Sequence, residues 1–218
     1  MHSEKTKEWI ERIGIMPVLR ARSAAEGHAL VEALVAGGIT VMEVTMTVPG
    51  AVELLRDLKK EHGEKLLLGS GTVTDPEQAA ATIDAGAEFV VSPGFHPEVV
   101  AKTKELGKVS IPGALTPTEV ITAWRAGADY VKIFPCSAVG GASYLKALLA
   151  PFPELRLIPT GGVTLQTAAD FLKAGARALG VGTDLVNPKA IEEGRPEKVT
   201  HTAQAYLEIV DGFRKTVG

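Results

Sequence analysis

The segment AGADYVKIFP at residues 126–135 decides the fold, because three other segments repeat its pattern. They are AGGITVMEVT at 36–45, AGAEFVVSPG at 85–94 and AGARALGVGT at 174–183. Each segment opens with Ala-Gly and continues into a short apolar run, and an amphipathic stretch precedes it. Glycine suits the left-handed turn that ends a helix. A short run that is apolar on both faces is typical of a strand buried in a parallel sheet. The repeats therefore predict four helix-to-strand units.

Further apolar runs lie between these units, and each is followed by a helical pattern. They are IMPVLRA at 15–21, KLLLGSGT at 65–72, VSIPGAL at 109–115 and LRLIPTGG at 155–162. Eight alternating strands and helices predict an α/β fold, the (β/α)8 TIM barrel, which about 200 residues can build. We expect an extra N-terminal helix at 3–13, a last helix at 197–215, and a single barrel domain over 1–218.

Two boundary signals support this pattern, and one motif is missing. Ser23 with Glu26 and Thr116 with Glu119 have the spacing of a capping box at a helix start. No G-x-G-x-x-G follows the first strand, which disfavours an open, dinucleotide-binding sheet as the alternative fold.

The composition is that of an ordinary globular protein. The 218 residues are 45% hydrophobic and 22% charged, with a net charge of −3. No basic block indicates nucleic-acid binding, and no apolar run approaches the roughly 20 residues of a membrane span. The charged start MHSEKTKEWIERIG lacks the apolar core of a signal peptide. The lone Cys136 fits a reducing compartment, so we expect a cytoplasmic protein that binds neither membranes nor nucleic acids.

Two charged residues interrupt strands that are otherwise apolar. Side chains alternate between the faces of a strand, so Glu43 lies opposite Met42 and Val44, which should meet the helices. The same alternation directs three residues of the sixth strand into the barrel: Tyr130, Lys132 and Phe134. Glu43 and Lys132 thus share the barrel interior, either as a structural ion pair or, as we favour, as a catalytic pair.

A lysine in a dry, partly apolar pocket is more easily deprotonated than one in water. Its neutral amine can attack a carbonyl carbon and form a Schiff base, and a nearby carboxylate can transfer protons. This pair is therefore suited to making or breaking a carbon–carbon bond next to a ketone.

Glycine-rich turns end the last two strands, with PTGG at 159–162 and GVGTD at 180–184. Turns at these two strands of a barrel often bind phosphate through backbone N–H groups. Together they predict a phosphorylated or otherwise anionic substrate.

Along nearly its whole length the sequence resembles the 2-keto-3-deoxy-6-phosphogluconate (KDPG) aldolases, which often also cleave 4-hydroxy-2-oxoglutarate (KHG). The segments that carry the resemblance are MEVTMT, GSGTV, VSPG, IPGALTPTE, VKIFP, IPTGG and GVGTDLV. The resemblance implies a class I aldolase that needs no metal or other cofactor and that assembles as a homotrimer. Its reaction would release pyruvate and glyceraldehyde 3-phosphate from the phosphorylated keto acid, or pyruvate and glyoxylate from KHG.

The resemblance also implies roles for individual residues. Lys132 would form the Schiff base, and Glu43 would be the general acid/base, acting through a water. The remaining candidates would bind substrate: Thr72 and Pro93 in the pyruvate pocket, Phe134 beside the lysine, Thr160 at the keto acid, and Gly161, Gly162, Gly182 and Thr183 at the phosphate.

One position departs from the pattern of the family. Some members have an arginine four residues after the glutamate, where it binds the pyruvate carboxylate, and here that position is Thr47. A carboxylate needs a cationic or N–H partner. Arg20, at the end of the first strand, is the substitute that we expect at the same barrel mouth.

Two other functions are compatible with a phosphate-binding barrel. One is a sugar-phosphate isomerase or epimerase, and the other is a non-catalytic barrel that senses a sugar phosphate. The first needs an acid/base pair or a metal but no Schiff base, and the second has no use for an unpaired lysine beside Glu43. No His, Asp or Glu residues have metal-ligand spacing in the sequence, so we expect no metal site.

Overall fold

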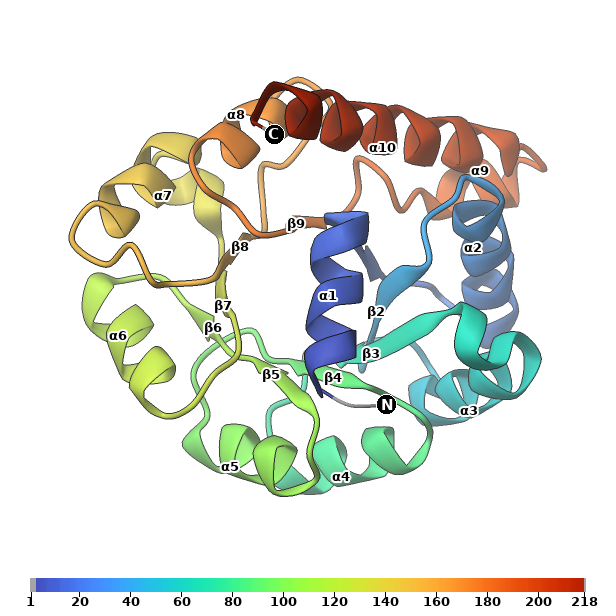
Figure 1. Ribbon diagram of the computed structural model, residues 1–218. Coiled ribbons are helices and arrows are strands. Elements are labelled where there is room, and N and C mark those ends of the chain that lie inside the picture. The colour runs from blue at the N-terminus through green and yellow to red at the C-terminus, as the bar shows by residue number, and fades with distance from the viewer. Residues whose placement is uncertain (1–2, 218) are drawn as a thin grey trace.

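The computed structural model describes residues 3–217, whose strands form a ring that helices surround (Figure 1). The strands are β1 (Ile15–Leu19), β2 (Val41–Thr45), β3 (Leu67–Gly71), β4 (Phe89–Val91), β5 (Val109–Ile111), β6 (Gly113–Ala114), β7 (Val131–Ile133), β8 (Leu157–Pro159) and β9 (Leu179–Val181). All paired strands run parallel. This arrangement confirms the predicted TIM barrel.

The ring closes at two places that the strand pairings identify. β5 and β6 are two halves of one predicted strand: β5 pairs with β4, and β6 pairs with β7. Pro112 lies between the halves, and its carbonyl accepts a hydrogen bond from the Lys132 N–H at 2.9 Å. On the other side, a bridge between Thr160 and Gly180 joins β8 to β9. The eight predicted strand regions thus complete the barrel.

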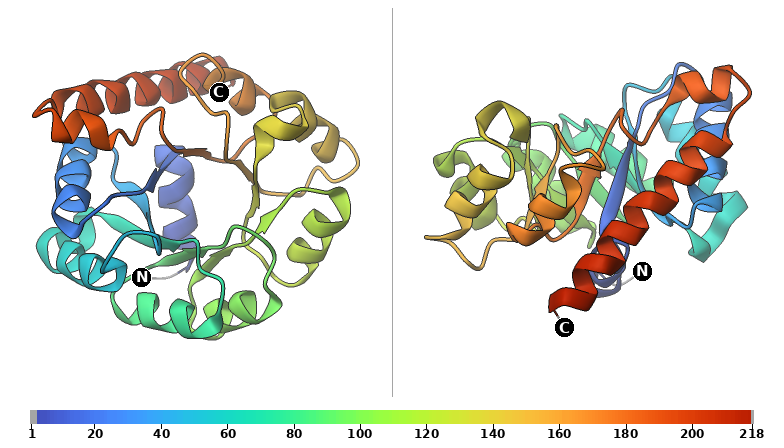
Figure 2. Two further views of the ribbon diagram at one scale, coloured as in Figure 1. Left: turned by 180° about the vertical axis from the view of Figure 1, so that it is seen from behind. Right: turned by 90° about the horizontal axis from the view of Figure 1, so that it is seen from above.

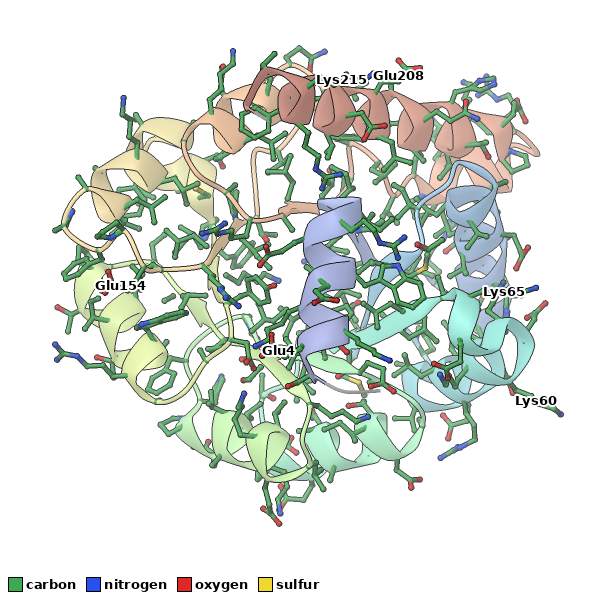
Figure 3. The ribbon with its side chains drawn as sticks, in the orientation of Figure 1. Glu4, Lys60, Lys65, Glu154, Glu208 and Lys215 are labelled. Carbon is green, nitrogen blue, oxygen red and sulfur yellow. The ribbon has the colours of Figure 1, made fainter. Side chains whose placement is uncertain are left out.

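Except for α1 (Ser3–Ile13), which precedes the first strand, the helices lie around the outside of the ring (Figures 1 and 2). The outer helices are α2 (Ala24–Ala36), α3 (Ala51–His62), α4 (Pro76–Asp84), α5 (Pro97–Glu105), α6 (Pro117–Arg125), α7 (Ala142–Leu149), α8 (Ala168–Lys173), α9 (Pro188–Glu192) and α10 (Glu197–Val217). Short 3-10 turns lie at Gly63–Lys65 and Cys136–Val139. The charged side chains labelled in Figure 3, among them Lys60 of α3 and Glu208 of α10, lie on the exposed surface.

Side-chain capping accounts for the residues at which α2 and α6 begin. Thr116 and Glu119 form the complete capping box that the sequence predicts at α6. At α2, the Ser23 hydroxyl accepts a hydrogen bond from the Glu26 N–H. The Glu26 carboxylate, however, turns to Arg22, which reaches it through both backbone and side chain. That capping box is therefore only half formed.

The barrel interior is apolar toward the amino-terminal ends of the strands. The apolar cluster there comprises Met16, Val41, Leu67, Phe89, Val91, Val109, Ile111, Tyr130, Ile158 and Ala178. The predicted extra helix, α1, covers this end of the ring (Figure 1), and its Ile10 packs into the same cluster. The Tyr130 hydroxyl donates to Glu11 of α1 at 2.8 Å. This end of the barrel interior is therefore closed by apolar side chains and by α1.

No helix among residues 3–217 is both long and apolar enough to cross a membrane.

Candidate active site

Lys132 of β7 and Glu43 of β2 meet inside the barrel, as the strand alternation predicts. The Lys132 Nζ atom lies 3.5 Å from the Glu43 Oε1 atom, and the two side chains are only 8% and 2% exposed. The alternating neighbours Val131, Ile133 and Val44 pack on the helix side of the sheet. An amine and a carboxylate are thus held together where solvent reaches very little of either side chain.

Glu43 occupies space that a glycine leaves open. The neighbouring strand ends at Gly71, where a Cβ atom would lie 1.9 Å from Glu43 Oε1 and 2.4 Å from its Cδ atom. Glu43 Oε1 is buried and has no hydrogen-bond partner among the described residues. A buried acceptor without a donor is costly, and here it leaves the carboxylate oxygen able to accept a proton from a bound molecule.

Lys132 also lies beside an aromatic ring. Its Nζ atom is 5.5 Å from the centre of the Phe134 ring, a distance at which a cation is attracted to the ring face. Phe134 itself lines a cavity at the carboxyl ends of the strands. Phe134 therefore connects the lysine to the cavity, although neither Lys132 nor Glu43 is itself among the residues that line it.

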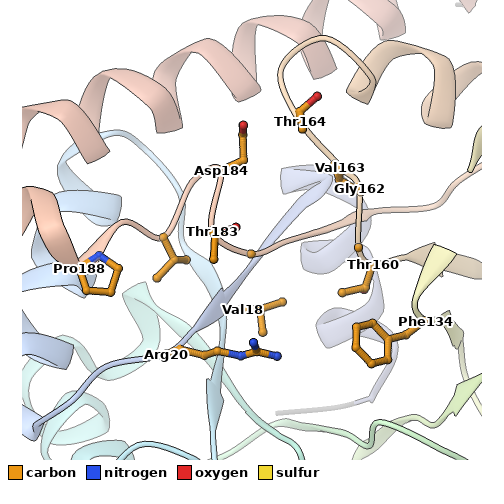
Figure 4. Close-up of a pocket in the computed structure, with 13 residues that line it drawn as sticks. Val18, Arg20, Phe134, Thr160, Gly162, Val163, Thr164, Thr183, Asp184 and Pro188 are labelled. Atoms are coloured by element: carbon orange, nitrogen blue, oxygen red, sulfur yellow. The ribbon is translucent and has the colours of Figure 1, made fainter. Parts of the chain in front are cut away.

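The cavity has a volume of about 530 Å³ (Figure 4). It is lined by seven predicted residues, namely Arg20, Phe134, Thr160, Gly161, Gly162, Gly182 and Thr183. The exposed Arg20 extends into it from the end of β1 toward Phe134 (Figure 4). Thr160 lies next to Phe134, and Thr183 lies on the side of Val18 and Arg20. The cavity therefore joins a cationic side chain and the Phe134 ring to the two glycine-rich turns.

The backbone of these turns is suited to an anion. Gly161 and Gly162 have φ angles of 89° and 76°, a region that side chains other than glycine rarely adopt. A Cβ atom at Gly162 would lie 2.4 Å from Cβ of Ser137. Within residues 3–217, the N–H groups of Gly162 and Thr183 donate no hydrogen bond to another group. Both remain available to phosphate oxygens.

Three predicted substrate residues lie outside the lining of the cavity. Thr72 follows β3 and has a φ of 60°, the single positive value among the described residues other than glycine. Pro93 follows β4, and its carbonyl lies against Gly113. Thr47 is exposed beyond β2, where its hydroxyl is 2.7 Å from that of Thr45. All three belong to the same rim of the barrel, but their contact with substrate stays a prediction.

Sequence reasoning missed six residues that line the cavity: Val18, Val163, Thr164, Asp184, Val186 and Pro188. Val18 could have been found, because it alternates with Arg20 on β1. The Asp184 carboxylate accepts a hydrogen bond from the Tyr206 hydroxyl at 2.5 Å. That bond comes from α10, far away in the sequence, and no local pattern predicts it.

Cys136 is buried shortly after β7, the strand that carries Lys132, and it lacks the features of a catalytic nucleophile. Its Sγ atom lies 3.6 Å from the Gly141 carbonyl oxygen, and burial raises the pKa of the thiol to about 11. A thiol of this kind is unreactive near neutral pH, which agrees with a packing role.

The comparisons with known proteins agree on one family. The family model described as KDPG and KHG aldolase matches residues 6–202. A 2-dehydro-3-deoxy-phosphogluconate aldolase of Treponema pallidum is 38% identical and covers 93% of this chain and 96% of its own. A 2-dehydro-3-deoxy-6-phosphogalactonate aldolase of Escherichia coli is 33% identical over 96% of this chain and 99% of its own. The solved KDPG aldolase of Legionella pneumophila, with pyruvate captured as a covalent carbinolamine, has a TM-score of 0.85 and 30% identity, covering 92% of this chain and 97% of its own.

Proposed function

The chain belongs to the KDPG and KHG aldolase family, and on this premise we propose that Lys132 is its Schiff-base lysine and Glu43 its general acid/base. The protein is then an aldehyde-lyase that cleaves KDPG to pyruvate and glyceraldehyde 3-phosphate. The observation that carries this proposal is the buried pair itself, with 3.5 Å between Lys132 Nζ and Glu43 Oε1.

The reaction follows from the positions of these two groups. Glu43 takes a proton from the Lys132 ammonium group, and the neutral amine attacks the C2 ketone to give a carbinolamine. Glu43 returns that proton to the carbinolamine hydroxyl, which leaves as water, and an iminium forms. Glu43 takes the proton of the C4 hydroxyl, directly or through a water. The C3–C4 bond then breaks, its electrons enter the iminium to give an enamine, and the aldehyde leaves.

The second half returns the enzyme to its starting state. Glu43 donates its proton to C3 of the enamine, which regenerates an iminium. Addition of water to C2 and collapse of the carbinolamine release pyruvate and free Lys132. One carboxylate serves both as base and as acid, so its reach to both C3 and the C4 hydroxyl is essential.

The ends of the substrate are matched to the ends of the cavity. We assign the carboxylate to Arg20, since Thr47 cannot supply the charge found at that position in other family members. We assign the phosphate to Gly161, Gly162, Gly182 and Thr183. Thr72, Pro93 and Thr160 would line the keto-acid part between them. The guanidinium group of Arg20 in the cavity and the N–H groups of Gly162 and Thr183, which donate to no described group, support the two assignments.

The alternative functions are not supported by the relatives, which are named as aldolases. A sugar-phosphate isomerase needs an acid/base pair and no imine, and a sensor needs neither. Neither function needs a lysine that forms an imine, and a sensor has no use for a lysine beside Glu43.

Two further properties belong to this proposal. We propose that residues 1–218 act as one domain in the cytoplasm and assemble as a homotrimer. Light scattering coupled to gel filtration measures the assembly directly, and the mass of a monomer would contradict it.

Trapping of the imine tests the chemistry. The protein is incubated with pyruvate and borohydride, and the modified peptide is identified by mass spectrometry. We expect a reduced adduct on Lys132 that is absent without pyruvate and absent in Lys132→Arg. An adduct on another lysine, or none in folded protein, would overturn the assignment.

The substrate is then identified by turnover. KDPG, its galactonate epimer and KHG are compared by kcat/KM in an assay that detects released pyruvate. We expect turnover of KDPG to exceed that of the epimer, in line with the higher identity to the phosphogluconate enzyme. A reversed order would correct the sugar while leaving the Lys132 chemistry in place.

A further inference from the structure

Helices α2 and α3 carry a cluster of histidine and glutamate side chains on the outside of the barrel. We call His28, Glu32, Glu61 and His62 the α2–α3 cluster. His28 and Glu32 are four residues apart on α2 and therefore project from the same face, while Glu61 and His62 end α3. The two helices pack against each other, which brings the four side chains together.

The distances in the cluster are those of candidate metal ligands. His62 Nε2 lies 3.0 Å from Glu32 Oε1, and His28 Nδ1 lies 3.7 Å from Glu61 Oε2. One ligand atom each from Glu32, Glu61 and His62 all lie within 4.8 Å of one another. Tetrahedral zinc with ligand bonds of about 2.1 Å separates its ligand atoms by roughly 3.4 Å. Small rotations of the glutamates, whose side chains are 57% and 55% exposed, would close the remaining gap.

An unsatisfied nitrogen points into this cluster. His62 Nε2 is buried, and despite its approach to Glu32 it has no hydrogen-bond partner among the described residues. Buried polar atoms without a partner are rare and invite an explanation. Coordination of an ion by this nitrogen would satisfy it, and the two carboxylates would balance the charge of a divalent cation.

We propose that Glu32, Glu61 and His62 bind a divalent cation of the zinc type, with His28 as a fourth or supporting ligand. A mixture of imidazole and carboxylate favours zinc over magnesium or calcium, which prefer oxygen ligands alone. The ion clamps α2 to α3 and stabilises the fold. It lies outside the barrel that encloses Lys132, so it takes no part in the aldol reaction and does not depend on the proposed function.

The sequence analysis predicted no metal site, and this proposal differs from that prediction. The ligands come from two helices on either side of β2, and their spacing along the chain resembles no metal motif. Only the packing of α2 against α3 brings them together.

Calorimetry with ZnCl₂ tests the proposal on tag-free protein that has been treated with a chelator. We expect one Zn²⁺ per chain and a higher thermal midpoint with zinc, since a ligand that binds the folded state stabilises it. His62→Gln should abolish the binding, and His28→Gln should weaken it by roughly 10–100-fold. His201→Gln is the matched control, because His201 is exposed on α10, and it should bind as the wild type does.

A second variant distinguishes the loss of a zinc ligand from misfolding of the protein. Glu32→Gln changes an exposed side chain, so it should fold normally and still lose most of the zinc affinity. No binding to the wild type, or equal binding by the wild type and both the His62 and Glu32 variants, would overturn the proposal.

Discussion

Replacement of Gly71 by alanine should disable the enzyme although it replaces neither of the proposed catalytic residues, Lys132 and Glu43. The added Cβ would lie 1.9 Å from Glu43 Oε1, whereas ordinary contacts begin at 3.4 Å. The carboxylate must therefore retreat by about 1.5 Å. The φ angle of Gly71 is not positive, so alanine meets no backbone strain there, and the effect is purely one of space.

The size of the loss follows from the role of Glu43. Displacement of a reacting group by about 1 Å can cost roughly 100-fold in rate, and a general base contributes about 100- to 10,000-fold. We expect kcat to fall by at least about 100-fold in Gly71→Ala. Overpacking should also lower the free energy of unfolding by about 1–3 kcal/mol.

Release of pyruvate from KDPG, coupled to lactate dehydrogenase, measures kcat, and borohydride trapping monitors Lys132 separately. Gly71→Ala should still form the pyruvate adduct, because its lysine is intact. Gly212→Ala is the control, since a Cβ there meets nothing within 4 Å, and it should leave kcat unchanged. A folded Gly71→Ala protein with kcat within a few-fold of the wild type would refute the role given to Glu43.

Three further predictions concern single residues. Arg20→Ala should raise the KM for pyruvate-containing substrates while the adduct still forms at saturating pyruvate, and an unchanged KM would remove Arg20 from the carboxylate site. Thr116→Ala should lower the free energy of unfolding by about 1 kcal/mol, because α6 loses its N-terminal cap. Urea titration measures this change, and an unaltered unfolding midpoint would show that the cap does not stabilise the protein. Cys136, whose pKa burial raises from 9.0 to about 11, should resist alkylation in the native protein near neutral pH. Its ionisation then contributes nothing to stability below about pH 9 and destabilises the fold as the pH rises from 9 toward 11; rapid native labelling would contradict the burial.

The architecture and the meeting of Glu43 and Lys132, the proposed catalytic pair, could be predicted from the sequence. Repeated Ala-Gly turns and short apolar runs are local signals, and each maps to a strand in the structure. The inward direction of Glu43 and Lys132 follows from the two-residue period of a strand, which needs no knowledge of the partner strands.

The closure of the barrel and the packing of its helices determined the distances between side chains of different elements, which the sequence alone did not predict. They placed Lys132 Nζ 3.5 Å from Glu43 Oε1 across the barrel, made Gly71 the residue that gives Glu43 its room, and brought Asp184 to Tyr206. They also kept Thr47, Thr72 and Pro93 out of the cavity lining. Periodicity determines on which face of an element a side chain lies. Distances between side chains of different elements depend on how those elements pack, and packing is a property of the whole fold.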